Sequence, residues 1–124
     1  NFRARFYILK SQYTCYRKTK TYLKKYSIMC IIRLEDIMKR QQHYPDAGTA
    51  LYAEIVSNLQ DEQIIIDSEN VRGIPTLMLN TSIGRLIDEF GYSRIKGRIC
   101  FKHMGKTDAE TLRKYISHYI SKTV

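Results

Sequence analysis

The sequence predicts an α/β domain built on a mainly parallel sheet. Two patterns support this prediction. Short apolar runs, typical of strands buried on both faces, alternate with amphipathic segments in which apolar residues recur every three to four positions. From residue 28 onward the predicted order is strand, helix, strand, helix, strand, helix. Such alternation favours parallel strands, because each crossover then runs through a helix.

The first predicted pair is a strand in residues 27–36 and a helix in residues 43–62. The strand is indicated by the apolar run in SIMCIIRLED. Either Asp46 or Thr49 can cap the helix, since its side-chain oxygen can accept a free backbone N–H. The helix has an apolar stripe at four-residue spacing. The stripe consists of Leu51, Ile55 and Leu59.

The second pair is a strand in residues 63–70 and a helix that follows Pro75 and ends near Phe90. The run QIIIDSEN indicates the strand. Gly91 follows the last periodic residue and is expected to cap the helix in a left-handed conformation. The apolar stripe of this helix comprises Leu79, Ile83, Leu86, Ile87 and Phe90.

The third pair is a strand in residues 97–103 and a helix in residues 106–124. GRICFKH has the apolar character of a buried strand, and the last segment again repeats apolar residues at helical spacing. Its stripe comprises Ala109, Leu112, Ile116, Tyr119 and Ile120.

The preceding residues, 1–27, form a separate basic N-terminal arm. Apolar and polar residues alternate from Phe2 to Ile8, which is the pattern of a strand with one buried face. Residues 11–27 fit either a second strand or a helical turn. We expect the arm to add one or two strands, as a hairpin, at an edge of the sheet. The predicted organisation is therefore the arm, 1–27, and one domain, 28–124.

Composition excludes several classes of protein. The longest apolar run, Ile28 to Ile32, is far too short to span a bilayer. No apolar segment of the kind found in signal peptides follows the N-terminus. The three cysteines include no C-x-x-C pair, so reduced thiols in a cytoplasmic protein are expected.

The charge is uneven. The net charge is +9, and residues 1–26 hold eight of the 21 basic residues and none of the 12 acidic residues. Basic side chains interleaved with tyrosines can bind phosphates and stack on bases, so a small nucleic-acid-binding protein is an alternative function. The basic residues between the tyrosines are Arg17, Lys18, Lys20, Lys24 and Lys25.

No motif predicts catalysis, a cofactor or a metal. Glycine-rich nucleotide loops and the G-x-S-x-G elbow are absent. Cys100 and His103 stand at C-x-x-H spacing, but no second pair completes a four-ligand zinc site. We therefore expect a protein that is not an enzyme, with no cofactor and no metal.

The turn from the second strand into its helix holds the candidate site. Asp67 lies at the carboxyl end of a buried strand, where α/β sheets place functional loops. Pro75 fixes its own backbone and makes Ile74 extended, which puts Thr76 near the helix N-cap. The Thr76 hydroxyl could cap the helix. Alternatively, it could be exposed and accept a phosphate beside free backbone N–H groups.

The stretch IIIDSENVRGIPTLMLNTSIGRLIDEFG, residues 64–91, followed by IKGRICFKHM and a helix ending LRKYISHYI, resembles the STAS-like domains. These are related to the STAS domains of sulfate transporters and anti-sigma factor antagonists. The resemblance covers about residues 27–121 and lies in the order and spacing of the elements. It implies a mixed, mainly parallel sheet of four or five strands, with helices packed mainly on one face.

The resemblance also implies a function. It implies no catalysis and no cofactor, and a regulatory role in bacteria through binding another protein, such as a kinase of the anti-sigma type. Anti-sigma factor antagonists are switched by phosphorylation of a serine at the position of Thr76; here Pro75 replaces the usual preceding aspartate. The implied contact residues are Asp67, Arg72, Thr76 and Asn80. A homodimer is also compatible with the sequence.

Overall fold

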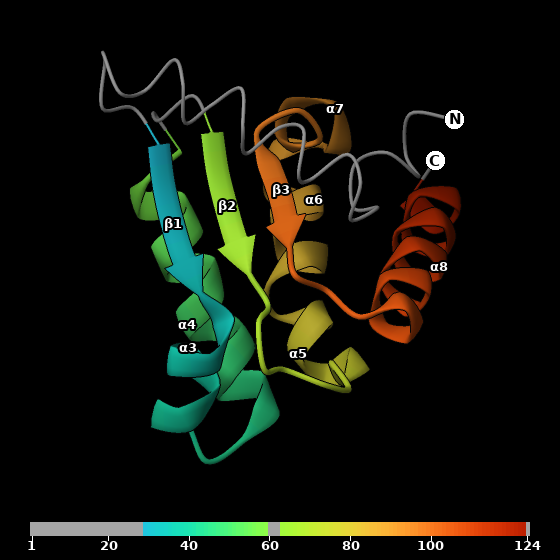
Figure 1. Ribbon diagram of the computed structural model, residues 1–124. Helices are drawn as coiled ribbons and strands as arrows, with labels where there is room; N and C mark the ends of the chain where they lie inside the picture. Colours follow the sequence, from blue (N-terminus) through green and yellow to red (C-terminus); the bar gives the residue numbers. More distant parts are fainter. Residues whose placement is uncertain (1–28, 60–62, 124) are drawn as a thin grey trace.

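A computed structural model of the protein describes residues 29–59 and 63–123 (Figure 1). The predicted basic arm, residues 1–27, lies outside these ranges. The described elements follow one another in the order β1 (Met29–Arg33), α3 (Leu34–Arg40), α4 (Tyr44–Ser57), β2 (Gln63–Asp67), α5 (Thr76–Asn80), α6 (Ile83–Phe90), α7 (Tyr92–Ile95), β3 (Ile99–Lys102) and α8 (Lys106–Thr123). The predicted alternation of strands and helices from residue 28 onward is therefore confirmed.

The described strands form one parallel sheet in the order β1-β2-β3. In register, Ile31 lies opposite Ile65, and Ile65 lies opposite Cys100. Asp67 stands between Arg33 and Lys102 at the carboxyl-terminal edge. The parallel α/β architecture agrees with the prediction. The four or five strands that the resemblance implies stay a prediction, because the arm expected to add strands is not among the described residues.

The two faces of the sheet differ in what covers them. Figure 1 shows α4 and α6 on the same face, behind the strands in that view, with α5 below the ends of β2 and β3. The side chains of Ile32, Ile64, Ile66, Ile99 and Phe101 belong to the core cluster packed against these helices. Ile31, Ile65 and Cys100 point to the other face and are not part of that cluster. Among the described residues, the main core thus lies between the sheet and its helices.

The first strand is shorter than predicted. β1 ends at Arg33, and Leu34 begins α3 within the segment expected to be extended. Glu35 and Asp36 lie in the first turn of α3, and Lys39 and Arg40 in its last turn, the arrangement that the helix dipole favours. Burial of Leu34 and Ile37 fixes this short helix to the core.

The predicted caps of α4 are wrong. The helix begins at Tyr44, so Asp46 and Thr49 already lie within it. Pro45 in the first turn explains the earlier start, since its fixed backbone angle suits that position and it needs no N–H partner. The Thr49 hydroxyl instead donates a hydrogen bond to the Pro45 carbonyl oxygen at 3.0 Å.

The helix predicted after Pro75 is broken into two. α5 ends at Asn80 and α6 begins at Ile83. The buried Ser82 is not helical (φ −123°, ψ −82°), and its hydroxyl donates to the Met78 carbonyl oxygen at 2.7 Å. The predicted stripe is nevertheless buried, because the break keeps Leu79 and the apolar residues of α6 on the core side. α6 ends at Gly91, whose φ of 84° is positive as expected but whose ψ of 141° is not left-handed helical.

Candidate functional site

The loop between β2 and α5, residues 68–75, is held by its apolar residues and contains one turn, closed by the hydrogen bond from the Val71 N–H to the Ser68 carbonyl oxygen. Val71 and Ile74 are buried in the core. Asn70 and Gly73 have positive φ angles of 67° and 75°. Asn and Gly are the residues that adopt this conformation most readily, so the local sequence suits the loop.

A buried carboxylate fixes the same loop to α8. Asp108, in the first turn of α8, accepts hydrogen bonds from the backbone N–H of Gly73 at 3.0 and 3.1 Å and of Ile74 at 3.2 Å. Its side chain is almost fully buried. Sequence reasoning missed this contact because an acid in the first turn of a helix is ordinary, and 35 residues separate it from Gly73.

Thr76 is the first residue of α5 and is exposed. Pro75 occupies the N-cap, and its carbonyl oxygen accepts hydrogen bonds from the N–H groups of Met78 and Leu79. The cap interpretation of Thr76 is therefore wrong, because the helix starts one residue too early for its hydroxyl to cap it. Within residues 29–59 and 63–123 this hydroxyl has no hydrogen-bond partner.

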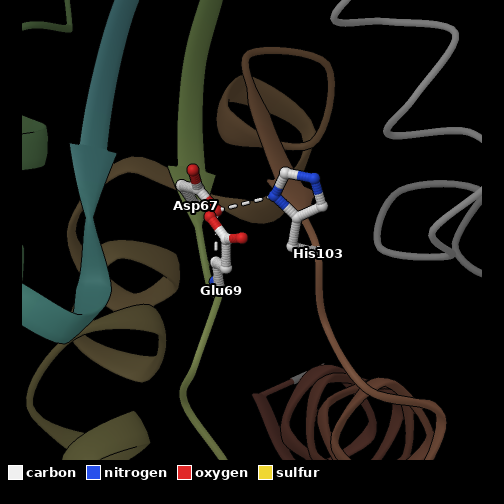
Figure 2. Close-up of side chains that lie close together, drawn as sticks. All are labelled: Asp67, Glu69 and His103. Carbon is white, nitrogen blue, oxygen red and sulfur yellow. Dashed lines mark hydrogen bonds and ion pairs between the residues drawn. The ribbon is translucent and has the colours of Figure 1, made fainter.

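The other predicted contact residues divide into two places. Arg72 and Asn80 are exposed on the loop and on α5, as Thr76 is. Asn80 accepts a hydrogen bond from the Tyr115 hydroxyl of α8 at 2.7 Å. Asp67 lies instead at the end of β2, where its side chain is directed toward His103 (Figure 2).

Two large apolar side chains are exposed on α4 and α5. Leu77 is 57% exposed, and Tyr44, at the start of α4, is 51% exposed. The Thr81 hydroxyl lies 2.9 Å from the Pro45 carbonyl oxygen and 3.4 Å from that of Leu77, which joins the two helices at this point. Leu77 and Tyr44 therefore flank one helix junction. We use the name Thr76 corner for the exposed residues of the α4 start, the β2–α5 loop and α5, namely Tyr44, Arg72, Thr76, Leu77 and Asn80.

A cluster of ionisable side chains lies at the carboxyl-terminal edge of the sheet (Figure 2). His103 follows β3, and its Nδ1 lies 3.0 Å from the Asp67 Oδ1 atom. The same oxygen accepts a hydrogen bond from the Glu69 backbone N–H at 3.1 Å. Ligand atoms of Asp67, Glu69 and His103 all lie within 4.8 Å of one another. The sequence search missed this cluster, because 36 residues separate Asp67 from His103.

The charge state of Asp67 reflects these contacts. Burial by itself raises the pKa of the carboxyl group. The hydrogen bond with His103 and the one from the Glu69 N–H, together with the electrostatic interactions with His103 and Lys102, outweigh burial and hold the pKa below its usual value. Asp67 is therefore an anionic acceptor at neutral pH.

A cleft of about 520 Å³ lies at the opposite edge, near the amino ends of β2 and β3. Its wall is apolar except for two arginines. The lining residues are Val56, Leu59, Phe90, Arg94, Ile95 and Arg98. The length of the strands separates this cleft from both the Thr76 corner and the Asp67 cluster.

The basic residues of the nucleic-acid alternative are not among the described residues. This applies to Arg17, Lys18, Lys20, Lys24 and Lys25.

In the described part of the chain, no helix combines the length and the apolar character needed to cross a membrane.

Comparison with known proteins agrees with the fold. The chain has no significant match among curated proteins or among solved structures. A family model described as a STAS-like domain of unknown function (DUF4325) matches residues 47–109, just over half of the 124-residue chain. The match runs from the first turn of α4 to the first turn of α8 and includes the predicted contact residues. The chain therefore belongs to this family of STAS-like domains.

Proposed function

We propose that the protein is a non-catalytic regulatory domain that binds another protein through the Thr76 corner. The observation that carries the proposal is the exposure of the Thr76 hydroxyl, without a partner among the described residues, directly beside the exposed Leu77. Contiguous exposed apolar patches with a polar rim are typical of interaction surfaces, whereas single exposed apolar residues are common, so the proposal requires Leu77 and Tyr44 to act in one patch. Membership of a STAS-like family supports a binding role by analogy with anti-sigma factor antagonists.

The finer part of the proposal is a phosphorylation switch at Thr76. A partner kinase transfers the γ-phosphoryl group of ATP to the Thr76 Oγ1 atom, ADP leaves, and the hydroxyl proton is released. The product carries about −1.5 to −2 charges at neutral pH. Burying Leu77 against a partner would then require the neighbouring phosphate to lose its water, which is costly.

Asp108 adds a second reason why the phosphate would weaken binding. Its carboxylate already accepts hydrogen bonds from the backbone N–H groups of Gly73 and Ile74, so these groups cannot bind the phosphate. The phosphate on Thr76 would instead lie two residues from Ile74, whose backbone N–H binds the buried Asp108 carboxylate. We therefore expect phosphorylation to release the partner rather than to strengthen the complex.

The proposal is tested by recovering partners from the native host with the full chain as bait. The variants Leu77→Asp and Thr76→Glu should lose a partner that the wild-type chain recovers, because each places a charge on the Thr76 corner. Thr111→Glu is the matched control, since Thr111 is an exposed threonine on α8. Equal recovery by all four baits would disprove the proposed surface.

The switch has a separate test. The wild-type chain is incubated with the recovered partner and ATP, and phosphate is located by mass spectrometry. Phosphate on Thr76 is expected, and the Thr76→Val variant should remain unmodified. Labelling of other residues alone would leave the binding surface standing and remove the switch.

The charge of residues 1–26 supports a second candidate function, nucleic-acid binding. Release of counterions from phosphates would make the affinity fall steeply with salt. A gel-shift titration should show this for the wild-type chain but not when Lys18, Lys20, Lys24 and Lys25 are replaced by Gln. Unchanged binding by the variant would exclude these four lysines as the phosphate contacts.

A further inference from the structure

We propose that Asp67, Glu69 and His103 form a binding site for a divalent transition-metal ion such as Zn²⁺. The site lies where β2 and β3 end, and it does not depend on the function proposed for the Thr76 corner. It also differs from the sequence-based expectation, which considered His103 only together with Cys100.

Three side chains from two neighbouring strand ends converge on one point. Asp67 is the last residue of β2, Glu69 follows two residues later, and His103 comes directly after β3. Because parallel strands end at the same edge, their carboxyl ends bring residues far apart in sequence together. Figure 2 shows the Asp67 carboxylate and the His103 ring facing each other, with the Glu69 carboxylate beside Asp67.

The spacing suits a metal ion. Zn²⁺ binds imidazole nitrogen and carboxylate oxygen at about 2.0–2.2 Å, which places neighbouring ligand atoms about 3–4 Å apart. The Asp67 Oδ1 and His103 Nδ1 atoms are 3.0 Å apart, and all three ligand atoms lie within 4.8 Å of one another. Glu69 is exposed, so a rotation of its side chain can close the remaining gap.

The ligand set selects the kind of ion. An imidazole nitrogen favours Zn²⁺, Co²⁺, Ni²⁺ or Cu²⁺, whereas Mg²⁺ and Ca²⁺ prefer oxygen ligands alone. Two carboxylates supply the negative charge that a divalent cation needs. Lys102 opposes this attraction, because its positive charge acts on Asp67. We therefore expect moderate affinity, with a dissociation constant in the micromolar range.

Three protein ligands leave at least one coordination position open. Glu69 and His103 are exposed, so the open position faces solvent. Water, or a donor atom of a bound molecule, would occupy it. The simpler alternative is that Asp67 and His103 form only an exposed hydrogen-bonded pair, which would need no metal and would add little stability.

The test is a calorimetric titration of the full chain with ZnCl₂, followed by visible spectroscopy with CoCl₂. One saturable site is expected. The variants His103→Asn and Glu69→Gln should weaken binding about tenfold or more, since even loss of an outer-shell partner costs 10–100-fold in affinity. Asn tolerates the positive φ of 61° at His103. His118→Asn, an exposed histidine on α8, is the control and should bind like the wild type.

Several outcomes would overturn the proposal. These are the absence of saturable Zn²⁺ binding, unchanged affinity in both site variants, equal affinity for Mg²⁺, or a strong thiolate charge-transfer band with Co²⁺, which would indicate a cysteine site elsewhere. A measurement on the wild type avoids any effect of a variant on folding. Substoichiometric Co²⁺ should broaden the NMR signals of His103 before those of His43 and His118, and equal broadening of all three would also contradict the site.

Discussion

Gly48 lies where α4 and α5 approach so closely that a side chain does not fit. A Cβ atom at this position would stand 1.9 Å from the Thr81 Oγ1 atom and 2.3 Å from the Met78 carbonyl oxygen. The Thr81 hydroxyl cannot withdraw without cost, because it donates to the Pro45 carbonyl oxygen at 2.9 Å. This glycine therefore sets the distance between the two helices, and with it the shape of the Thr76 corner.

The Gly48→Ala substitution should destabilise the protein by about 1–3 kcal/mol, because it overpacks a contact that includes backbone atoms. Urea unfolding followed by far-UV circular dichroism measures the change. Gly97→Ala is the control, since a Cβ there meets nothing within 4 Å. It should be neutral or stabilising by up to about 1 kcal/mol. Equal effects of the two substitutions would contradict the close approach.

Asp108 holds the β2–α5 loop through the backbone N–H groups of Gly73 and Ile74. The Asp108→Ala substitution leaves the N–H groups of Gly73 and Ile74 without their acceptor, which should cost about 1–3 kcal/mol. Amide hydrogen exchange should become faster at these two residues in particular. Glu110→Ala, an exposed change in the same helix, should alter stability by no more than about 0.5 kcal/mol. Unchanged exchange in Asp108→Ala would show that the loop is held by other contacts.

Among the elements, α8 is fastened to α5 and α6 by two tyrosines. The Tyr115 hydroxyl donates to the Asn80 Oδ1 atom at 2.7 Å, and the Tyr119 hydroxyl donates to the Asp88 Oδ2 atom at 2.5 Å. Both rings lie over Gly84, where a Cβ atom would stand 2.5 Å from the Tyr115 hydroxyl and 3.0 Å from the Tyr119 ring. The absence of a side chain at Gly84 thus allows α8 to pack closely against α6.

The raised pKa values of these tyrosines predict a loss of stability at alkaline pH. Burial, together with the charge of Asp88, raises the pKa of Tyr115 to about 12. Burial and the hydrogen bond to Asp88 raise the pKa of Tyr119 to about 12. Above pH 10 the unfolded chain loses these protons first, so the folded state binds more protons and its stability falls as pH rises toward 12.

The measurement is urea unfolding at several pH values between 9 and 12. The stability difference between the wild type and the Tyr115→Phe, Tyr119→Phe double variant should be constant below pH 10 and shrink above it, because phenylalanine does not titrate. A difference that stays constant up to pH 12 would show that the two hydroxyls keep their ordinary pKa values.

The secondary structure was predictable where periodicity was long and was not predictable where the chain changes direction. The stripes of α4, α6 and α8 recur over several turns, and their apolar residues are buried or half-buried as expected. α3 follows β1 without an intervening loop, and only two of its seven residues are buried, so its pattern is too short to detect. The break at Ser82 depends on a side-chain hydrogen bond that periodicity does not encode.

Across the whole molecule, the parallel arrangement of the strands followed from the alternation of elements, but the contacts that shape the candidate sites did not. Asp67 meets His103, and Asp108 meets Gly73, each over more than 30 residues of sequence. No local sequence pattern indicates such pairs. The first arises because parallel strands end at one edge of the sheet, and the second because α8 packs onto the loop. The sequence could locate Thr76 at the corner, but it could not show that Pro75, rather than Thr76, occupies the N-cap.

The arrangement of one helical layer against one face of the sheet makes a last prediction, about the distribution of stability. Ile31 and Ile32 are neighbours in β1 and point to opposite faces. Ile32 is buried in the core, whereas Ile31 is 46% exposed. Ile32→Ala should therefore cost about 2–5 kcal/mol, through lost burial and the cavity that it leaves. Ile31→Ala should cost about 1 kcal/mol or less through lost burial. Both substitutions also lose the preference of isoleucine for strands, by an equal amount.

Urea unfolding of the two variants, followed by circular dichroism and by tyrosine fluorescence, compares these costs. The two probes should report one coincident transition in each variant, because a single core joins the sheet to its helices. Equal costs for Ile31→Ala and Ile32→Ala would mean that the second face of the sheet is packed as tightly as the first. In that case the stability of the domain would depend on the packing around Ile31 as well as on the helices.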